Sequence, residues 1–502
     1  MFIKKIAILF EKPSFSALFF LVLAYIRTII EYTIQKNFGL AVNASVAHSI
    51  SFYLLCYVIT LIIIYLGRKK GINDSFKWTN IVFILLPFPP IVDYYLFNPA
   101  TVYSYSSIEH FWGNYFTFFN KYTDASPGQK LLGIYIFTTI FICVFKSRKR
   151  TFPSLMASLS SYTYTVLISI PWIQHLFPSF SARNIEAVNM SSIALHQKFC
   201  IFYIFLSLIL LLALWILKDP YILKPLINTL SPVRSLHMIQ MGWFGLIQSD
   251  IAVLPDFFLS NIIILTISIL FAWWLIALVN DYYDIDIDKI SNRNRLLVAV
   301  PKYKTSLTGW LYWIGLFSIL STISVGVTPA VIISIYIAGG LIYSIPPIRL
   351  RYYIFSPSFI GIGSMLLYLF GSSYYIVSIN QWLTKINYTS VLILLFAFSL
   401  SAYIKDEKDR NSDRVDNIKT LFTLFDYKKA KTISTIFLFS GWTMLYIFVN
   451  GMLLNMIYFS CIAATIYISY KQKSAMWHII NFQIFIFINN IVCLSDKKFI
   501  LF

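Results

Sequence analysis

Charged residues are scarce in this sequence of 502 residues, where Asp, Glu, Lys and Arg together make up 12%. A typical soluble protein contains about 25% of these residues. In their place, 58% of the residues are hydrophobic and the mean hydropathy is +0.72. Apolar runs of roughly 18 residues or more recur along the chain, and each is long enough to cross a bilayer as a helix. The sequence therefore predicts an all-α polytopic membrane protein and excludes an ordinary soluble one.

Cysteine is also rare, and no two of the five cysteines are spaced as a CxxC pair. This excludes a CxxC-type metal or redox site, and we expect buried apolar thiols instead. The start of the chain, MFIKKIAILFEKPSFS, lacks a long apolar core followed by a small-residue cleavage site. We therefore expect a cytoplasmic tail before the first span rather than a removed signal peptide.

The formal net charge of +19 is distributed unevenly between the predicted loops. The loops that share a side with the N-terminus hold most of the 40 lysines and arginines. The positive-inside rule then places the N-terminus in the cytoplasm and the C-terminus outside. Basic residues at that surface contact the anionic headgroups of the lipid bilayer. The basic charge thus predicts a membrane partner and no nucleic acid.

Four aspartates interrupt this pattern in the stretch NDYYDIDID, residues 280–288, at the end of an apolar run. Carboxylates are costly beside hydrocarbon, so their position needs a reason. On one continuous helix, Asp281, Asp284 and Asp288 fall within an arc of about 60°. Asp286 falls on the opposite face, where we expect it to be solvated or paired with a lysine.

A second acidic stretch, IKDEKDRNSDRVDNIKTL, repeats the spacing with Asp406, Asp409 and Asp413. Both triplets follow apolar spans whose exits are predicted to be cytoplasmic, so two carboxylate faces can meet at one membrane surface. Like charges at this spacing repel each other unless a cation compensates them. Oxygen ligands without Cys or His suit a hard ion such as Mg²⁺, which commonly bridges carboxylates to phosphate oxygens. The pattern points to a diphosphate ligand.

The aspartates allow other interpretations. An EF-hand is excluded, because the position that requires Gly is Lys289 and the position that requires Glu is Arg295. Ordinary charged loops that flank membrane helices explain one triplet better than two of matched spacing. An ion-coupled transporter that uses the acidic clusters remains the alternative function.

The two acidic stretches resemble the motifs of the UbiA-type intramembrane prenyltransferases. NDYYDIDID fits their NDxxDxxxD motif, and KDEKDRNSDRVDNIKTL is similar to their second motif. LIYSIPPIRLRYY, residues 341–353, is similar to a YSxPPxRL segment found in several branches. SNRNRLL lacks the proline that many members carry after the first motif, and Ser412 replaces a common Gly, so the substrate branch stays open.

The resemblance covers about residues 225–500 and implies a nine-helix transmembrane bundle, which agrees with nine apolar spans counted there. We therefore predict a UbiA-like domain at 226–502, preceded by a six-helix transmembrane domain of unknown role at 1–225. In the latter we expect Arg27 to pair with Glu31. We also expect the prolines of LLPFPP to break a helix before Asp93, and structural pairing of that acid.

The resemblance also implies an activity, the transfer of a prenyl group from a prenyl diphosphate at the cytoplasmic face. The acceptor would be a hydrophobic or aromatic molecule, such as a quinone precursor or a lipid alcohol. The catalytic residues implied are the Mg²⁺ ligands Asp281, Asp284, Asp406 and Asp409. Asp288 and Asp413 are further metal ligands, and the residues expected to bind the diphosphate are Asn280, Arg293, Arg295, Tyr343, Arg349 and Lys405. Four polar residues of the first helix could line an acceptor pocket or form interhelical hydrogen bonds: His237, Gln240, Gln248 and Asp250.

Overall fold

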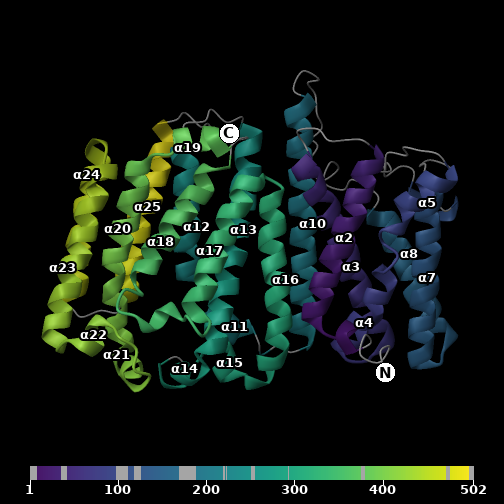
Figure 1. Ribbon diagram of the computed structural model, residues 1–502, viewed down its shortest axis with the longest axis horizontal. Coiled ribbons are helices and arrows are strands. Elements are labelled where there is room, and N and C mark those ends of the chain that lie inside the picture. Colours follow the sequence, from purple (N-terminus) through teal and green to yellow (C-terminus); the bar gives the residue numbers. More distant parts are fainter. Residues whose placement is uncertain are drawn as a thin grey trace. The chain divides into compact units, whose positions relative to one another are not determined.

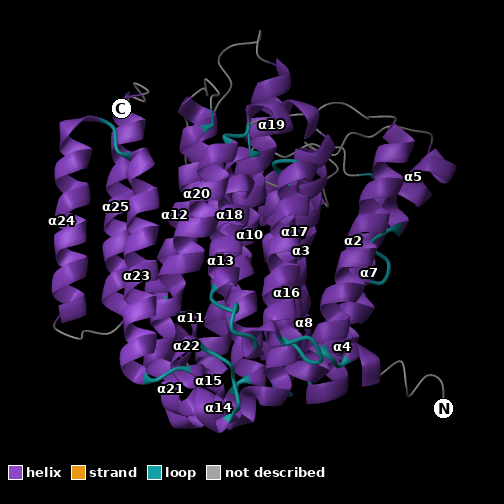
Figure 2. Ribbon diagram, turned by 60° about the vertical axis from the view of Figure 1, so that its left-hand side comes forward, coloured by secondary structure: helices purple, strands orange, loops and turns teal. Residues whose placement is uncertain are grey.

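The computed structural model is helical throughout the part of the chain that it describes, and no strand occurs there (Figure 2). The described residues are 8–35, 42–97, 111–117, 126–168, 188–218, 221, 223–249, 255–291, 293–374, 379–470 and 475–496. Nine helices among them are long and apolar enough to cross a membrane, and three further apolar helices are shorter. The chain is thus an integral, multi-pass membrane protein.

The chain divides into two compact units, which are described separately. The first comprises Met1–Pro220 together with Thr305–Leu316, and the second comprises Tyr221–Lys304 and Phe317–Phe502. The division falls a few residues before the boundary that we expected at 225/226, within the proline-containing segment KDPYILKPLINTLSP. The helix α16 (Lys304–Ile323) contributes to both units.

The first unit contains long helices at the six predicted apolar runs, one of them broken. Its helices are α2 (Pro13–Gln35), α3 (Val42–Arg68), α4 (Ile72–Phe83), α5 (Phe88–Phe97), α6 (Phe111–Thr117), α7 (Pro127–Arg148), α8 (Thr151–Ile168) and α10 (Val188–Lys218). The break between α4 and α5 coincides with LLPFPP, because proline removes a backbone donor and clashes with the preceding turn. The expected break is confirmed.

Two acids of this unit have structural partners. The Asp93 carboxylate accepts a hydrogen bond of 2.7 Å from the backbone N–H of Gly128, in the first turn of α7. An anion at that place satisfies a helix N–H that has no partner within the helix. Glu31 pairs with Arg27 one turn away on α2, with 3.4 Å between Oε2 and Nε. Both pairings agree with the sequence-based expectation.

Among its described residues, the second unit has nine long helices, one at each of the nine predicted spans (Figure 1). One of them, α16, is shared with the first unit. They are α12 (Pro232–Gln248), α13 (Pro255–Tyr283), α16, α17 (Val327–Ser344), α18 (Ser358–Ser372), α20 (Tyr388–Ser401), α23 (Tyr427–Leu445), α24 (Gly451–Tyr470) and α25 (Ala475–Asp496). The helix α12 packs against α13, α18 and α25, and α18 packs in turn against α17 and α20.

Short helices lie together at one end of this bundle (Figure 1). They are α11 (Leu223–Leu230), α14 (Ile285–Ser291), α15 (Leu296–Ala299), η6 (Leu350–Tyr352), η7 (Ala402–Lys405), α21 (Asp406–Val415) and α22 (Leu421–Leu424). The helix α14 carries part of the first acidic motif, α21 carries the second, and the two helices pack against each other. The fold therefore brings both motifs to the same end of the bundle.

The expectation of one continuous helix through the first motif is wrong in detail. The helix α13 ends at Tyr283 and α14 begins at Ile285, so the break falls at Asp284. At this break the guanidinium of Arg349 donates a 3.1 Å hydrogen bond to the backbone carbonyl of Tyr283. The backbone N–H of Asp284 still bonds to Asn280, at 2.9 Å, and that of Asp288 to Asp284, at 2.8 Å. The helical spacing of the aspartates therefore survives the break.

Candidate active site

A cavity of about 500 Å³ lies within the second unit. One part of its wall is ionic and comes from the ends of α13 and η7 and from α14 and α21. The aspartates that line it are Asp284, Asp288, Asp406, Asp409 and Asp413. The rest of the wall is mainly apolar and aromatic, with Trp273, Tyr336, Phe359, Phe398 and Phe482 among its residues. A single cavity thus presents both charged groups and an apolar surface to a ligand.

Asp281 lies behind this wall rather than on it, and its side chain is buried with 1% exposure. Its carboxylate forms an ion pair with Arg295 and accepts a 2.7 Å hydrogen bond from the Thr229 hydroxyl. The same hydroxyl accepts a 2.9 Å hydrogen bond from the backbone N–H of Leu296, so Thr229 joins α11, α13 and α15. Burial lowers the pKa of Arg295, but the nearby carboxylates of Asp281 and Asp288 raise it by more. Arg295 therefore stays cationic at the cavity wall.

Asp284 is the most heavily paired acid of the site. Its carboxylate forms ion pairs with Arg351 and, at 2.7 Å, with Arg349. It also accepts a 2.6 Å hydrogen bond from the Asn280 side chain, whose own oxygen accepts from the Ser344 hydroxyl at 3.3 Å. Three segments, α13, α17 and η6, are thereby held together around a single buried carboxylate.

The second triplet has a different environment. Asp406 is buried, and its Oδ2 has no hydrogen-bond partner within the described ranges. Over the same ranges, Oδ1 of Asp409 also lacks a partner. The carboxylate of Asp413 lies 3.9 Å from the guanidinium of Arg351, which therefore connects the two motifs. The second motif thus keeps buried carboxylate oxygens open on the cavity side of α21.

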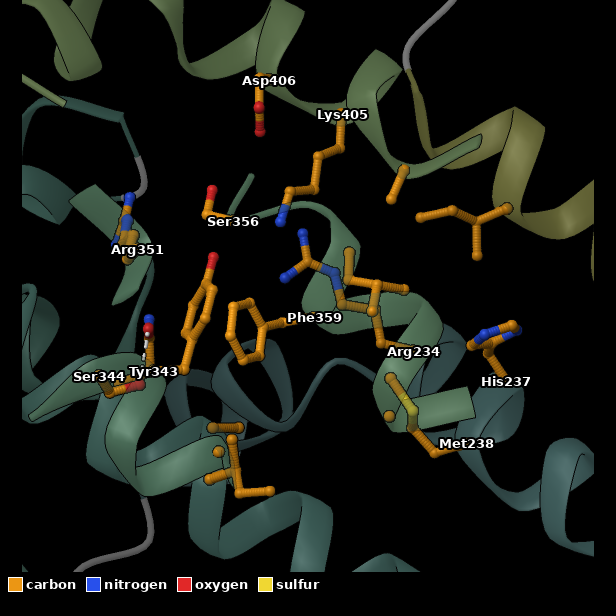
Figure 3. Close-up of a pocket in the computed structure, with 18 of the residues that line it drawn as sticks. Arg234, His237, Met238, Tyr343, Ser344, Arg351, Ser356, Phe359, Lys405 and Asp406 are labelled. Carbon is orange, nitrogen blue, oxygen red and sulfur yellow. Dashed lines mark hydrogen bonds between the residues drawn. The ribbon is translucent and has the colours of Figure 1, made fainter. Parts of the chain in front are cut away.

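Two further cations face the same space (Figure 3). Lys405 and Arg234 line the cavity, and their charged groups point toward one another in the close-up. The Lys405 ammonium lies 5.8 Å from the centre of the Tyr343 ring. For the described part of the chain, neither Lys405 nor Arg234 forms an ion pair. Two adjacent cations that lie beyond ion-pair distance of the neighbouring carboxylates form a natural binding point for an anion.

The remaining predicted residues differ in their placement. Asn280, Arg295 and Tyr343 line the cavity. Arg349 does not line it and acts on Asp284 from behind the wall. Arg293 is exposed and donates a hydrogen bond of 3.2 Å to the backbone carbonyl of Lys289. Asp286 is also exposed and pairs with Lys289 at 2.7 Å, as the helical geometry predicts.

Of the polar residues on the first helix of the bundle, His237 lines the cavity and Gln240 does not. Gln248 accepts hydrogen bonds from Tyr368 and Ser390, at 3.3 and 3.2 Å, so it forms interhelical hydrogen bonds. Asp250 lies outside the described residues. Sequence reasoning missed Arg234 as a residue of the site, although its position three residues before His237 on one helix was a usable signal.

The donor set of the second motif fits a hard cation. Its oxygens are carboxylate oxygens, two of them buried and without a hydrogen-bond partner in the described chain. Within the described residues, however, no group of three or more His, Cys, Asp or Glu side chains is arranged closely enough to hold a metal ion. Metal binding at both motifs remains a prediction from the sequence.

Comparison with known proteins agrees with the motifs. The sequence pattern of the UbiA prenyltransferase family matches residues 243–488. No curated protein matches the chain significantly. Among solved structures, a UbiA homologue from Archaeoglobus fulgidus bound to GPP and Mg²⁺ is 14% identical, with a TM-score of 0.42, covering 54% of this chain and 99% of the other.

Two further solved structures are similar over a comparable share of the chain. A UbiA homologue from Aeropyrum pernix K1 is 16% identical, with a TM-score of 0.42, covering 52% of this chain and 97% of the other. A structure described for digeranylgeranylglyceryl phosphate synthase is 17% identical, with a TM-score of 0.38, covering 55% and 98%. The family match includes both acidic motifs and the YSIPPIRL segment. Residues 243–488 of this chain thus form a domain that matches the UbiA prenyltransferase family.

Proposed function

We propose that the second unit transfers a prenyl group from a prenyl diphosphate to a hydrophobic or aromatic acceptor, with Mg²⁺ as cofactor. In this reaction the bond between C1 of the prenyl chain and the diphosphate oxygen breaks, and the electron pair leaves with the diphosphate. A new bond forms between C1 and the acceptor, which releases a proton. The observation that carries the proposal is the joint presence of ionic and apolar walls in one cavity.

The ionic wall suits the diphosphate. Arg234, Lys405 and Arg295 bring cations to the cavity from three separate segments, and the Tyr343 hydroxyl points into the same space (Figure 3). Cationic donors form short, strong hydrogen bonds with phosphate oxygens. In a cavity shielded from water, they also stabilise the charge that develops on the leaving diphosphate. Of these residues, Arg234 is added to the set expected from the sequence.

The acidic residues suit Mg²⁺. Asp406 and Asp409 would hold it through their open oxygens, with Asp413, Asp284 and Asp288 on the same wall. Bound Mg²⁺ would supply positive charge that lowers the barrier to breaking the allylic C–O bond. Arg349 and Arg351 already occupy the carboxylate of Asp284, so a metal there would share its ligand with guanidinium groups. Asp281 would act through Arg295 and Thr229 rather than by facing the cavity.

The apolar wall suits the prenyl chain. Trp273, Phe359 and Tyr336 come from three different helices and line the same cavity. Aromatic faces stabilise a carbocation by roughly 1–2 kcal/mol each when water is excluded. The acids lie at the end of the bundle, where α13 ends and where the short helices α14 and α21 begin. This favours the enzyme over the ion-coupled transporter, for which discontinuous helices at the midplane are typical.

The positive-inside rule supports a cytoplasmic position for the catalytic end and the N-terminus, with the C-terminus outside. The proposed reaction assigns no role to the first unit. It carries neither acidic motif, and no residue of it lines the described cavity.

The test is a transfer assay with purified full-length protein, radiolabelled geranylgeranyl diphosphate, Mg²⁺ and an extract of membrane lipids and quinone precursors. We expect a labelled lipid product that disappears with EDTA and in the variants Asp284→Asn and Asp409→Asn. The matched control is Asp286→Asn, since this acid belongs to the first motif but is exposed and faces away from the cavity. The absence of both product and Mg²⁺-dependent diphosphate binding would refute the proposal and favour the transporter.

A further inference from the structure

Two buried histidines also line the cavity. His237 on α12 has 6% of its surface exposed, and His478 on α25 has 4%. The Nδ1 atom of each imidazole is buried, and none of the described residues offers it a hydrogen-bond partner. The other nitrogen of His237 lies 3.4 Å from the Ser364 hydroxyl. Native proteins rarely leave buried polar atoms unpaired, and these two line a cavity from which a ligand can satisfy them.

The surroundings of His237 are aromatic, whereas His478 also lies near the ion pair of Lys431 and Glu407. The ring of His237 lies 5.0 Å from that of Phe398 in an edge-to-face arrangement, and Phe398 lies 5.8 Å from Phe482. Phe482 follows His478 by one turn on α25 and stacks on Trp442 at 4.2 Å. The two histidines thus belong to a wall of rings supplied by α12, α20 and α25.

This wall differs in charge from the ionic one. Arg234 and Lys405 offer the cavity two cations without an ion pair, which is suited to a diphosphate or another anion (Figure 3). A neutral imidazole instead offers one hydrogen-bond donor and one acceptor. A hydroxyl group has the same pair of functions, so it matches an imidazole, whereas an anion matches the cations nearby.

From this arrangement we infer that His237 and His478 bind the hydroxyl group of the prenyl acceptor, within a subsite formed with Phe398 and Phe482. The inference rests on the proposed function, because it assigns the second substrate of that reaction. It specifies a neutral, hydroxyl-bearing acceptor whose apolar body packs against the rings. Met238 and Phe398 would contact that body from two helices.

The test measures binding separately from catalysis. Purified full-length protein is first loaded with Mg²⁺ and radiolabelled geranylgeranyl thiodiphosphate, a donor analogue that does not transfer its prenyl group. Loaded protein is then incubated with the lipid and quinone-precursor extract, washed, and analysed by mass spectrometry for retained compounds. A second portion of extract is treated with acetic anhydride beforehand, so that its hydroxyl groups are capped. The variants are His237→Phe, His478→Phe and His237→Asn.

We expect wild-type protein to retain a hydroxyl-bearing compound from the untreated extract and nothing equivalent from the capped extract. Each Phe variant should retain about 10-fold less, which is the effect of losing roughly one hydrogen bond. His237→Asn should recover part of the loss, since its amide restores a polar group near Nδ1. The control is Asn490→Leu, because Asn490 is also buried on α25, with no partner for its amide among the described residues, yet does not line the cavity. It should behave as wild type.

The outcomes separate this inference from the proposed function. Loss of Mg²⁺-dependent donor binding in the wild type would overturn the proposed function, and the acceptor subsite with it. Three results, each with normal donor binding, would overturn the subsite alone. The Phe variants could retain as much of the compound as the wild type, the wild type could retain as much from capped as from untreated extract, or it could retain no compound. Because donor binding is measured in every variant, a misfolded variant is recognised before its retention is compared.

Discussion

Replacing Gly245 with alanine should separate two helices that carry the proposed site. Gly245 lies where α12 contacts α18, and a Cβ added there would lie 1.9 Å from the backbone carbonyl oxygen of Tyr368. Ordinary van der Waals contact begins at 3.4 Å, so the helices must move apart by about 1.5 Å. The obstacle is backbone, which cannot rotate away as a side chain can. Overpacking of this kind typically costs about 1–3 kcal/mol.

The measurement is thermal unfolding of the purified protein in detergent, followed by the transfer assay. At about 2–4 °C per kcal/mol, the apparent Tm should fall by roughly 2–12 °C. Activity should fall by about 100-fold, the effect of a 1 Å misplacement, because α12 carries Arg234 and His237. Gly133→Ala in α7 is the control, since its Cβ would meet nothing within 4 Å. A Gly245→Ala protein with wild-type Tm and activity would refute the close helix contact.

Three other perturbations have distinct expected outcomes. Arg351→Ala removes the guanidinium that connects Asp284 with Asp413, and breaking such a buried pair costs about 3–5 kcal/mol, reduced here by the remaining Arg349 contact. Transfer activity and Tm should both fall. The control is Arg293→Ala, because Arg293 is exposed, and its transfer activity and Tm should equal those of the wild type within error. Asp406→Asn should raise the Mg²⁺ concentration needed for half-maximal donor binding at least several-fold, as measured by a magnesium titration. Asp93→Ala removes the acceptor at the start of α7 and should lower the Tm by an amount equivalent to about 1 kcal/mol while diphosphate binding stays unchanged.

Much of the fold was predictable because a long apolar segment in the hydrocarbon of a membrane can adopt only a helix. A backbone in lipid must satisfy its own hydrogen bonds, so long apolar segments become helices. The helices of the second unit occur at the predicted spans for this reason. Proline positions were also readable, since LLPFPP breaks the helix where α4 ends. What apolar periodicity could not show is the interruption at Asp284, which coincides with a tertiary contact from Arg349 to the carbonyl of Tyr283.

The candidate site was predictable in its residue types but not in its pairing. Identical spacing placed both triplets on helical faces, and the structure brings them to the same end of the bundle. Spacing cannot tell that Asp281 turns behind the cavity toward Thr229 and Arg295. Arg234 was missed although it shares a helix face with His237, because one arginine before an apolar run also resembles a headgroup anchor. Pairing depends on chain segments far apart in sequence, and one sequence alone carries little information about them.

The two triplets, although equal in spacing, are unequal in electrostatics. Asp281 and Asp284 are neutralised by arginines from the chain itself, namely Arg295, Arg349 and Arg351. By contrast, Asp406 and Asp409 each keep an oxygen that no group in the described segments satisfies. A buried carboxylate oxygen without a hydrogen-bond partner is costly, so an external cation would stabilise Asp406 and Asp409 more than the arginine-paired Asp281 and Asp284. The first motif would then gain a cation only as its arginines turn toward an arriving anion. If the arginines move from the aspartates to the diphosphate, the aspartates become available to a metal ion. Donor binding would then be coupled to metal binding at the first motif.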